Sequence, residues 1–260
     1  MAPPISIFIV TLNEADRIGR TIRAVKDICT EIVVVDCGSN DGTPQLARSL
    51  GARVIHNEWP GYGAQKNFAE AQCRNDWVFN LDADEVVTPE LSNEIRAIFE
   101  NGDPHSDAYT VRIIEVYPGD DRPRALAYSL SRVRLYKREK GEFSLSPVHD
   151  VVELQPGVSQ AQLKHCIYHY SLRSIGREIS KFNSYTDAQV ADMERRSVKF
   201  SILRIYLEFP LAFLKAFIGR KHFIGGHYGF LVAMNYAIFR HLRVAKHYET
   251  RRAALLEQRK

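Results

Sequence analysis

Two aspartates, Asp82 and Asp84, end a short apolar run and are separated by one alanine. The preceding residues 77–81 have the pattern of a buried strand, and residues i and i+2 of a strand point to the same side. Both carboxylates are therefore expected at the carboxyl edge of a sheet, where open α/β sheets bind ligands. Mg²⁺ and Mn²⁺ prefer such oxygen ligands and complete their shell with phosphate oxygens and water. The pattern predicts a metal site that receives a diphosphate; the alternative is a solvated acidic turn.

Two further polar clusters follow apolar runs of the same kind. Residues 11–14 (Thr-Leu-Asn-Glu) follow the first run, and residues 36–43 (Asp-Cys-Gly-Ser-Asn-Asp-Gly-Thr) follow the second. Because the carboxyl ends of parallel strands meet at one edge of a sheet, all three clusters are expected side by side. We expect a nucleotide to lie across them.

The elements that must position these clusters alternate between strand and helix. Such alternation indicates right-handed βαβ crossovers and a mostly parallel, Rossmann-like sheet. No G-x-G-x-x-G and no G-x-x-x-x-G-K-[ST] occurs, which excludes the usual dinucleotide and P-loop folds. The expected strands are residues 5–12, 31–36, 53–56 and 77–81, and the expected helices are residues 14–26, 41–50 and 63–73.

The motifs T-L-N-E, V-V-D-x-G-S-x-D-G-T, Q-K-N-F-A and L-D-A-D-E occur in this order over residues 5–90, and the region resembles family 2 glycosyltransferases. The resemblance implies an α/β GT-A fold and a donor site in which Lys66 helps to hold the diphosphate. The alternatives without ligand binding are a strand-end cap for Asp36 and a solvated charge for Lys66. One departure is Cys37, where many members have a second Asp after the position of Asp36. The donor-binding residues that the resemblance implies are Thr11, Asn13, Glu14, Asp36, Lys66 and Asp82.

Beyond residue 100 the strand patterns become irregular and antiparallel in character. They cover residues 108–114, 132–137, 151–154 and 164–170. We therefore expect a catalytic domain over residues 1–174, with a donor-binding half (1–100) and an acceptor half (101–174). Residues 175–260 form a separate helical C-terminal region.

The segment Ser-Pro-Val-His-Asp at residues 146–150 presents an imidazole beside a carboxylate after a proline turn. An inverting transferase needs a general base for the acceptor hydroxyl, and Asp150 is our candidate. His149 either takes the proton itself or orients the carboxylate. A similar His-[Asp/Glu] follows a basic strand in the bacterial enzymes that add glucose to the lipopolysaccharide inner core, which this half resembles. The alternative is a purely local His-Asp hydrogen bond.

Two other sets of side chains are candidates for ligand contacts. His165 and His169 are four apart in an extended run, and His169 is a candidate additional ligand to a metal held by Asp84 and Asp82. A structural role in strand packing is the alternative for both histidines. Basic residues near residues 132–138 are candidates for contacts with acceptor phosphates, or they form a solvated strand face: Arg132, Arg134 and Arg138.

The net charge of +4 is unevenly distributed along the chain. Residues 1–194 carry 21 Lys and Arg against 28 Asp and Glu, a net −7, whereas residues 195–260 carry 14 against 3, a net +11. The basic residues of the tail alternate with long apolar, aromatic-rich runs, so we expect interfacial helices on an anionic membrane rather than nucleic-acid binding. A helical subdomain packed on the catalytic domain or on a second subunit is the alternative. A spanning helix within residues 222–239 is a third option.

The four scattered cysteines and the N-terminus without a leader pattern favour a cytoplasmic protein, peripherally associated with the inner face of the cytoplasmic membrane. The expected function is inverting transfer of glucose from UDP-glucose, with Mg²⁺ or Mn²⁺, to a lipid-linked saccharide of the lipopolysaccharide inner core. Alternatives are another donor, a polyprenyl-phosphate acceptor, or a membrane scaffold that binds the nucleotide sugar without turnover.

Overall fold

A computed structural model describes residues 2–100, 102–145, 151–198 and 201–257, and the chain divides into two compact units. The sheet unit comprises Met1–Glu115 and Ser129–Ser171, and the helical unit comprises Val116–Tyr128 and Leu172–Lys260. Residues 116–128 thus leave the sheet and belong with the C-terminal helices, which the sequence pattern did not indicate.

The sheet unit is built on one mixed sheet with the strand order β3-β2-β1-β4-β7-β6-β10-β5. β3, β2, β1 and β4 are mutually parallel, as the alternating pattern predicted. β7 runs antiparallel to β4 and β6, whereas β10 lies parallel to β6, so the second half is not purely antiparallel. The strands are β1 Ile5–Thr11, β2 Glu31–Asp36, β3 Arg53–His56, β4 Trp77–Asp82, β5 Glu85–Val87, β6 Ala108–Glu115, β7 Ser129–Lys137 and β10 Gln160–His169.

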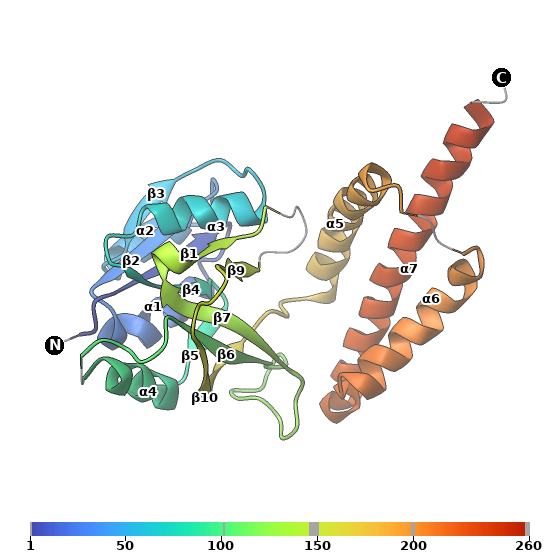
Figure 1. The fold of residues 1–260 in the computed structure, drawn as a ribbon. Helices are drawn as coiled ribbons and strands as arrows, with labels where there is room; N and C mark the ends of the chain where they lie inside the picture. The colour runs from blue at the N-terminus through green and yellow to red at the C-terminus, as the bar shows by residue number, and fades with distance from the viewer. Residues whose placement is uncertain (1, 101, 146–150, 199–200, 258–260) are drawn as a thin grey trace. The chain divides into compact units, whose positions relative to one another are not determined.

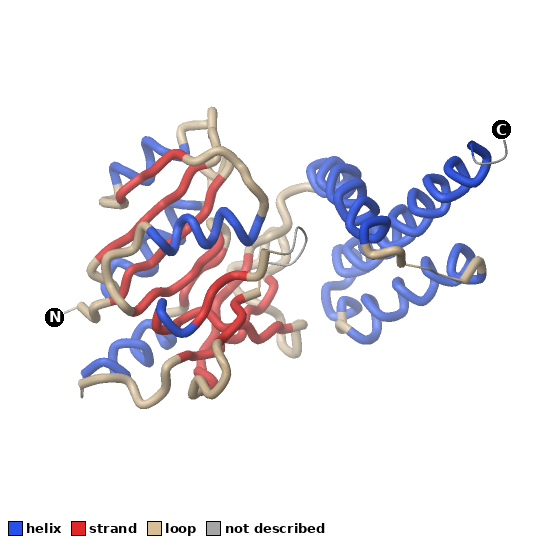
Figure 2. The backbone as a smooth tube through the Cα atoms, turned by 45° about the horizontal axis from the view of Figure 1, so that its top comes forward, coloured by secondary structure: helices blue, strands red, loops and turns tan. Residues whose placement is uncertain are grey.

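Helices cover both faces of this sheet because the buried strands are apolar on both sides (Figures 1 and 2). Ile5, Ile7 and Ile9 of β1 pack with α1 (Ile18–Val25), α2 (Thr43–Ser49) and α4 (Pro89–Glu100). Phe8 points to the opposite face, where α3 (Tyr62–Ala71) and a separate hairpin of β8 (Gly141–Phe143) and β9 (Val152–Leu154) pack. The α/β fold class predicted from the sequence is confirmed.

The first helix begins at Ile18, four residues later than the pattern predicted. Asn13 has a positive φ of 57°, and the backbone N–H groups of Glu14 and Ala15 donate to the side chains of Thr43 and Asp41. Because these N–H groups are bound to the neighbouring loop, residues 13–17 form a turn that connects two of the polar clusters.

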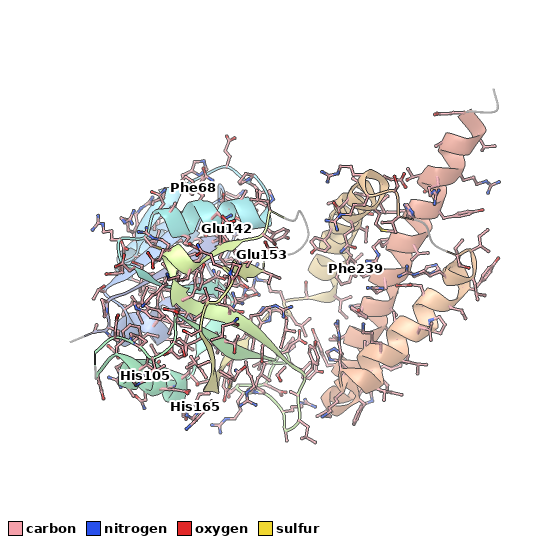
Figure 3. The ribbon with its side chains drawn as sticks, in the orientation of Figure 1. Phe68, His105, Glu142, Glu153, His165 and Phe239 are labelled. Carbon is pink, nitrogen blue, oxygen red and sulfur yellow. The ribbon has the colours of Figure 1, made fainter. Side chains whose placement is uncertain are left out.

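The helical unit contains α5 (Ile175–Arg195), α6 (Leu203–Leu214), the short π-helix η3 (Lys215–Gly219), the 3₁₀ turn η4 (His222–Gly225) and α7 (Gly226–Glu257). α7 packs against both α5 and α6, and Phe239 of α7 lies 4.9 Å from Phe182 of α5 between ring centroids (Figure 3). Across the described stretches of the chain, every helix falls short of the length or apolar character that crossing a bilayer demands.

Candidate active site

The two aspartates of the L-D-A-D-E motif lie at the end of β4 and in the turn that leads to β5. Asp82 keeps 37% of its side chain exposed, whereas Ala83 is buried and Glu85 is 1% exposed. The Asp82 backbone N–H donates to Glu85 Oε2 at 3.0 Å. The turn therefore presents the aspartates at the carboxyl edge of the sheet, as predicted, and keeps the glutamate beneath them.

Lys66 and Arg134 place two positive charges beside Asp82. Lys66 Nζ donates to Asp82 Oδ1 at 2.9 Å, and Arg134 lies 3.3 Å from Asp82 Oδ2. Burial alone would raise the pKa of the Asp82 carboxyl, but the two cations outweigh burial and hold this pKa well below its usual range. Asp82 is therefore an ionised carboxylate.

Arg134 also contacts the buried residues next to Asp82. Its guanidinium donates to Asn80 Oδ1 at 2.5 Å and is paired with Glu85. Burial raises the pKa of Glu85 even though Arg134 opposes the shift. Two cations, Lys66 and Arg134, therefore lie next to two carboxylates, Asp82 and Glu85, in a largely buried setting.

Asp84 has different partners from Asp82. Arg17 Nη1 lies 3.1 Å from Asp84 Oδ2, and His169 Nε2 lies 3.4 Å from Oδ1. β10 meets this turn because it pairs with β5 in a register that sets His169 opposite Glu85. Burial would lower the pKa of His169, but its contact with Asp84 raises that pKa to about 9. Of the three side chains predicted as metal ligands, the structure thus places His169 and Asp84 in direct contact, whereas Asp82 contacts Lys66 and Arg134.

A divalent cation is chemically compatible with this donor set. Carboxylate oxygens and a neutral imidazole suit Mn²⁺ or Mg²⁺, and Mg²⁺ commonly takes one or two protein carboxylates plus phosphate oxygens. Within the described residues, no three His, Cys, Asp or Glu side chains are arranged as a ready cation cage. A cation here would therefore rely on Asp84 and its neighbours together with the ligand's own oxygens.

The predicted nucleoside side of the site is a network of loops. Thr11 Oγ1 donates to Asp36 Oδ1 at 3.1 Å, and Asp36 also accepts from the backbone N–H groups of Gly38 and Ser39. Asn13 Oδ1 accepts from the Asn40 N–H at 3.0 Å, which joins the first cluster to the second. In this structure Asp36, 4% exposed, orders the loop, as the strand-end cap alternative describes.

Glu14 accepts a hydrogen bond from Arg17, three residues along the chain. Its Oε2 accepts from Arg17 Nε at 2.8 Å, and the same arginine contacts Asp84 and donates to the Tyr170 carbonyl oxygen at 2.9 Å. Arg17 therefore links the first polar cluster to the turn that carries Asp84. The sequence analysis missed it because its partners lie far along the chain, and a basic residue after T-L-N-E was the only signal.

The predicted base Asp150 and its neighbour His149 lie outside the described residues. The described residues on either side of this segment are paired, because the Ser144 N–H donates to the Val151 carbonyl oxygen at 2.9 Å. Asn67 of α3 exchanges two hydrogen bonds with the Phe143 backbone, at 2.9 and 2.7 Å. A Cβ on Gly63 would meet the Ser144 carbonyl oxygen at 1.8 Å, so α3 and the hairpin approach closely. The described residues Phe143 and Ser144 are thus packed on α3, the helix that carries Lys66.

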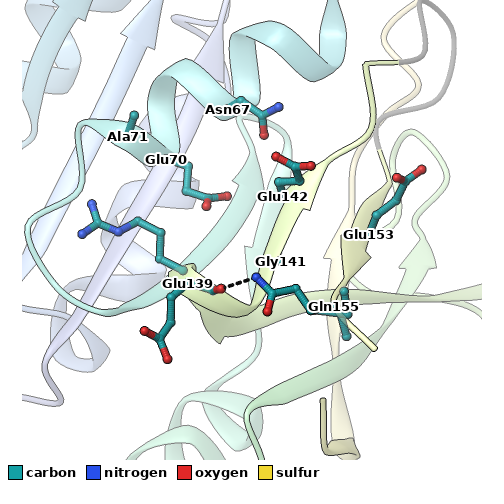
Figure 4. Close-up of a pocket in the computed structure, with 10 residues that line it drawn as sticks. Asn67, Glu70, Ala71, Glu139, Gly141, Glu142, Glu153 and Gln155 are labelled. Atoms are coloured by element: carbon teal, nitrogen blue, oxygen red, sulfur yellow. Dashed lines mark hydrogen bonds between the residues drawn. The ribbon is translucent and has the colours of Figure 1, made fainter. Parts of the chain in front are cut away.

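The three arginines predicted for acceptor phosphates do not lie together. Arg134 is 6% exposed within the Asp82 cluster, and Arg132 is half-buried on β7. Arg138 donates to the Cys73 carbonyl oxygen at 2.7 Å and lines an open pocket of about 780 Å³ (Figure 4). Because this pocket is also lined by Glu70, Glu139, Glu142 and Glu153, its charge is unfavourable for a phosphate.

His165 is separated from the site that contains His169. It is exposed, and its backbone N–H donates to Glu94 of α4 at 3.0 Å (Figure 3). The four-residue spacing of His165 and His169 would place both on one face of a regular strand, but the register of β10 against β6 shifts between Gln162 and Cys166 and interrupts the alternation. His165 therefore has the structural surroundings of the alternative interpretation.

Comparisons with known proteins give consistent family matches. The family model "Glycosyl transferase family 2" matches residues 6–152. "Uncharacterized glycosyltransferase RP128" of Rickettsia prowazekii is 41% identical over 251 residues, which cover 93% of this chain and 86% of that protein. "Lipopolysaccharide core biosynthesis glycosyltransferase LpsC" of Rhizobium meliloti is 28% identical, covering 95% and 92%. Among solved structures, S. aureus TarS 1-349 is similar with a TM-score of 0.47 and 17% identity, covering 89% and 81%.

Proposed function

The chain belongs to glycosyl transferase family 2, and we propose that it transfers a sugar with inversion from a nucleotide donor to a lipid-linked saccharide. The observation that carries this proposal is the pairing of Lys66 and Arg134 with Asp82 at the carboxyl edge of the sheet. A nucleotide-sugar diphosphate gains negative charge as its bond to the sugar breaks. Fixed cations beside that group stabilise the transition state more than the ground state.

We assign the donor side as follows. Lys66 binds the diphosphate, and Asp82 holds the lysine ammonium in position until the donor enters. Arg134 forms a second ion pair with Asp82, so we assign it to the donor site rather than to the acceptor site. The loops that carry Thr11, Asn13, Glu14 and Asp36 form the nucleoside pocket, and UDP-glucose is the proposed donor.

We propose Asp84 as the main protein ligand of a divalent cation, Mg²⁺ or Mn²⁺, with Asp82 and His169 beside it. When bound, this cation would neutralise charge on the diphosphate leaving group. His169 must lose its proton to act as a ligand, because only the neutral imidazole coordinates metals. Arg17 then remains the residue that holds Asp84 in place from the side of the first loop.

The acceptor hydroxyl must attack the anomeric carbon from the side opposite the diphosphate, and its proton needs a base there. We propose Asp150 as that base, with His149 orienting it or taking the proton. The support is the anchoring of the flanking residues Phe143 and Ser144 on α3. Of the other two arginines, Arg132 remains the candidate for contacts with a charged acceptor, because the carboxylates around Arg138 disfavour a phosphate there.

We propose a sugar of the lipopolysaccharide inner core as the acceptor, supported by the similarity to the lipopolysaccharide core glycosyltransferase LpsC over 95% of this chain and 92% of that protein. A lipid-linked acceptor requires the enzyme to work at a membrane. The net charge of +11 over residues 195–260 supports peripheral binding to the anionic inner face of the cytoplasmic membrane.

The test is a panel of nucleotide sugars incubated with the full chain, with and without Mn²⁺ or Mg²⁺, and with lipid-linked core saccharides. We expect nucleoside diphosphate release and transfer that require both cation and acceptor, with UDP-glucose preferred. The competing function is a non-catalytic scaffold, which would bind nucleotide sugars without releasing nucleoside diphosphate under any of these conditions. That result would overturn the proposal.

A further inference from the structure

The α6–α7 pair has its small residues inside and its large apolar residues outside. α6 and its continuation η3 lie along α7 (Figure 1), and four alanines of these helices are buried. Gly229 of α7 is buried against η4, where a Cβ would come within 1.7 Å of the His222 carbonyl oxygen. The buried small residues are Ala212, Ala216, Gly229, Ala233 and Ala237.

The outer face of the same helix is a continuous apolar stripe. Its members recur every three or four residues and are between 41% and 60% exposed. We call them the α6 stripe: Leu203, Leu207, Leu211, Leu214 and Ile218. Water-soluble helix pairs bury such residues, whereas helices in lipid pack through small residues and expose large apolar ones. An exposed stripe of this kind indicates an apolar partner.

Beside the stripe, three arginines surround one buried glutamate. Glu208 is 8% exposed in its side chain and accepts from Arg204 Nε at 2.7 Å and from Arg240 Nε at 2.8 Å. Arg243 Nη2 lies 3.6 Å from the same carboxylate. Within the described residues, Glu208 is the carboxylate that pairs with all three guanidiniums, so this arginine cluster carries a net charge of about +2 at neutral pH.

Within the described residues, the one carboxylate of Glu208 therefore balances only one of these three positive charges. The side chains of Arg240 and Arg243 are 27% and 18% exposed, and Nε of Arg243 is buried without a hydrogen-bond partner in the described structure. Burial and the neighbouring Arg240 lower the pKa of Arg243. A buried charge is costly unless it is paired, so binding of an anion would stabilise this arginine cluster.

Phosphate is the anion whose geometry suits several guanidiniums, since it accepts paired hydrogen bonds from their N–H groups. Arg204 belongs to the same helical turn as Leu203 and Leu207 of the stripe. A ligand that satisfies both features has a phosphate attached to apolar chains. We propose that Arg204, Arg240 and Arg243 bind the headgroup phosphate of an anionic phospholipid, with the α6 stripe in the acyl layer. This deepens the membrane part of the proposed function and rests on it.

The main test compares full-length variants by co-sedimentation with phosphatidylcholine vesicles that contain phosphatidylglycerol. The matched control is Arg251→Gln, which removes the same charge from an exposed position of α7. Loss of one general surface charge should weaken binding about fivefold. We expect Arg240→Gln and Arg243→Gln to weaken it by about tenfold more than the control, because each also loses charge-assisted hydrogen bonds. Equal losses in all three variants would overturn the specific site.

A second pair of variants reverses the sign of the change. Glu208→Gln frees the third arginine and should strengthen binding to the same vesicles, whereas Glu249→Gln removes an exposed carboxylate of α7 and serves as its control. Unchanged or weaker binding of a folded Glu208→Gln protein, relative to Glu249→Gln, contradicts the site. Circular dichroism verifies the folding of each variant.

The wild-type protein supplies a test that needs no variant. Inorganic phosphate is added against chloride at matched ionic strength, with thermal unfolding as the readout, and then as a competitor in the vesicle assay. We expect weak stabilisation and partial competition. Phosphate stabilisation without any vesicle binding would identify a site for a free anion and overturn the lipid assignment. Nucleoside diphosphate release by the arginine variants reports separately on the proposed function, and its absence in wild type leaves the lipid result intact.

Discussion

Lys66 and Asp82 form an ion pair of 2.9 Å in which the lysine is almost fully buried and the aspartate remains 37% exposed. The pair connects α3 to the end of β4, and Arg134 flanks the aspartate at 3.3 Å. The two aspartates of one motif therefore differ in their surroundings. Asp82 is paired with Lys66 and Arg134, whereas Asp84 contacts Arg17 and His169.

Asp84→Asn should lower transfer by at least about 10² and remove its dependence on Mn²⁺ or Mg²⁺, because the leaving diphosphate is less well neutralised. The measurement is nucleoside diphosphate release at increasing cation concentration. Asp103→Asn, at a side chain that is 83% exposed, is the control and should behave as wild type. Full activity of the Asp84 variant in EDTA contradicts the metal role.

Lys66→Met should weaken nucleoside diphosphate binding by about 10- to 100-fold, the range expected for hydrogen bonds to charged groups. Calorimetric titration with UDP measures the change. Lys26→Gln removes an exposed lysine and should leave the affinity unchanged. If Lys66→Met binds UDP normally while remaining folded, the lysine serves only to hold Asp82.

Asp150→Asn should lower transfer by about 10² to 10⁴, the usual contribution of a positioned base, with little change in donor affinity. His149→Ala in parallel decides which of the two neighbours takes the proton. A nearly normal transfer rate for Asp150→Asn, or a matching loss of UDP affinity, rules out the role assigned to it.

Glu70 should make the fold less stable as the pH rises. It is 6% exposed, and burial raises its pKa from 4.5 to about 7, although Tyr136 donates a hydrogen bond to it. Its folded state therefore binds a proton more tightly than the unfolded state. The resulting stability is complete below pH 4.5 and is lost as the pH rises to 7, a difference of about 3 kcal/mol.

Glu70→Gln keeps an acceptor for Tyr136 and removes this titration. We therefore expect the variant to gain stability relative to wild type between pH 5 and pH 8, measured by urea unfolding at both values. Glu142→Gln, an exposed neighbour in the same pocket, should show no such gain. Parallel curves for wild type and Glu70→Gln contradict the shifted pKa.

The full chain should sediment with anionic vesicles and be released at least partly by high salt or alkaline carbonate, because charge supplies much of an interfacial attachment. Vesicles of phosphatidylcholine alone are the control and should retain less protein. Attachment that resists both washes and yields only to detergent contradicts a peripheral mode of binding.

The sequence predicted the parallel half of the sheet well because apolar runs, turn residues and strand ends follow local rules. The edge position of Asp82 and Asp84 followed from the same rules and is confirmed. Contacts between residues far apart in the sequence could not be predicted from local patterns: Arg17 with Asp84, and Arg134 with Glu85. Arg134 was interpreted as a contact for acceptor phosphates or as part of a solvated strand face, because nothing local in residues 132–138 reveals that β7 lies next to β4.

Because the segment Val116–Tyr128 belongs to the helical unit, the chain passes between the two units three times, at residues 115/116, 128/129 and 171/172. Within the helical unit, Tyr117 contacts His222 at 2.8 Å and Arg124 donates to the Ile224 carbonyl oxygen at 3.1 Å. A single proteolytic nick near residue 172 should therefore yield two fragments that stay associated and co-elute. The C-terminal helices are consequently a poor target for removal by truncation, because residues 116–128 would lose the helices on which they pack.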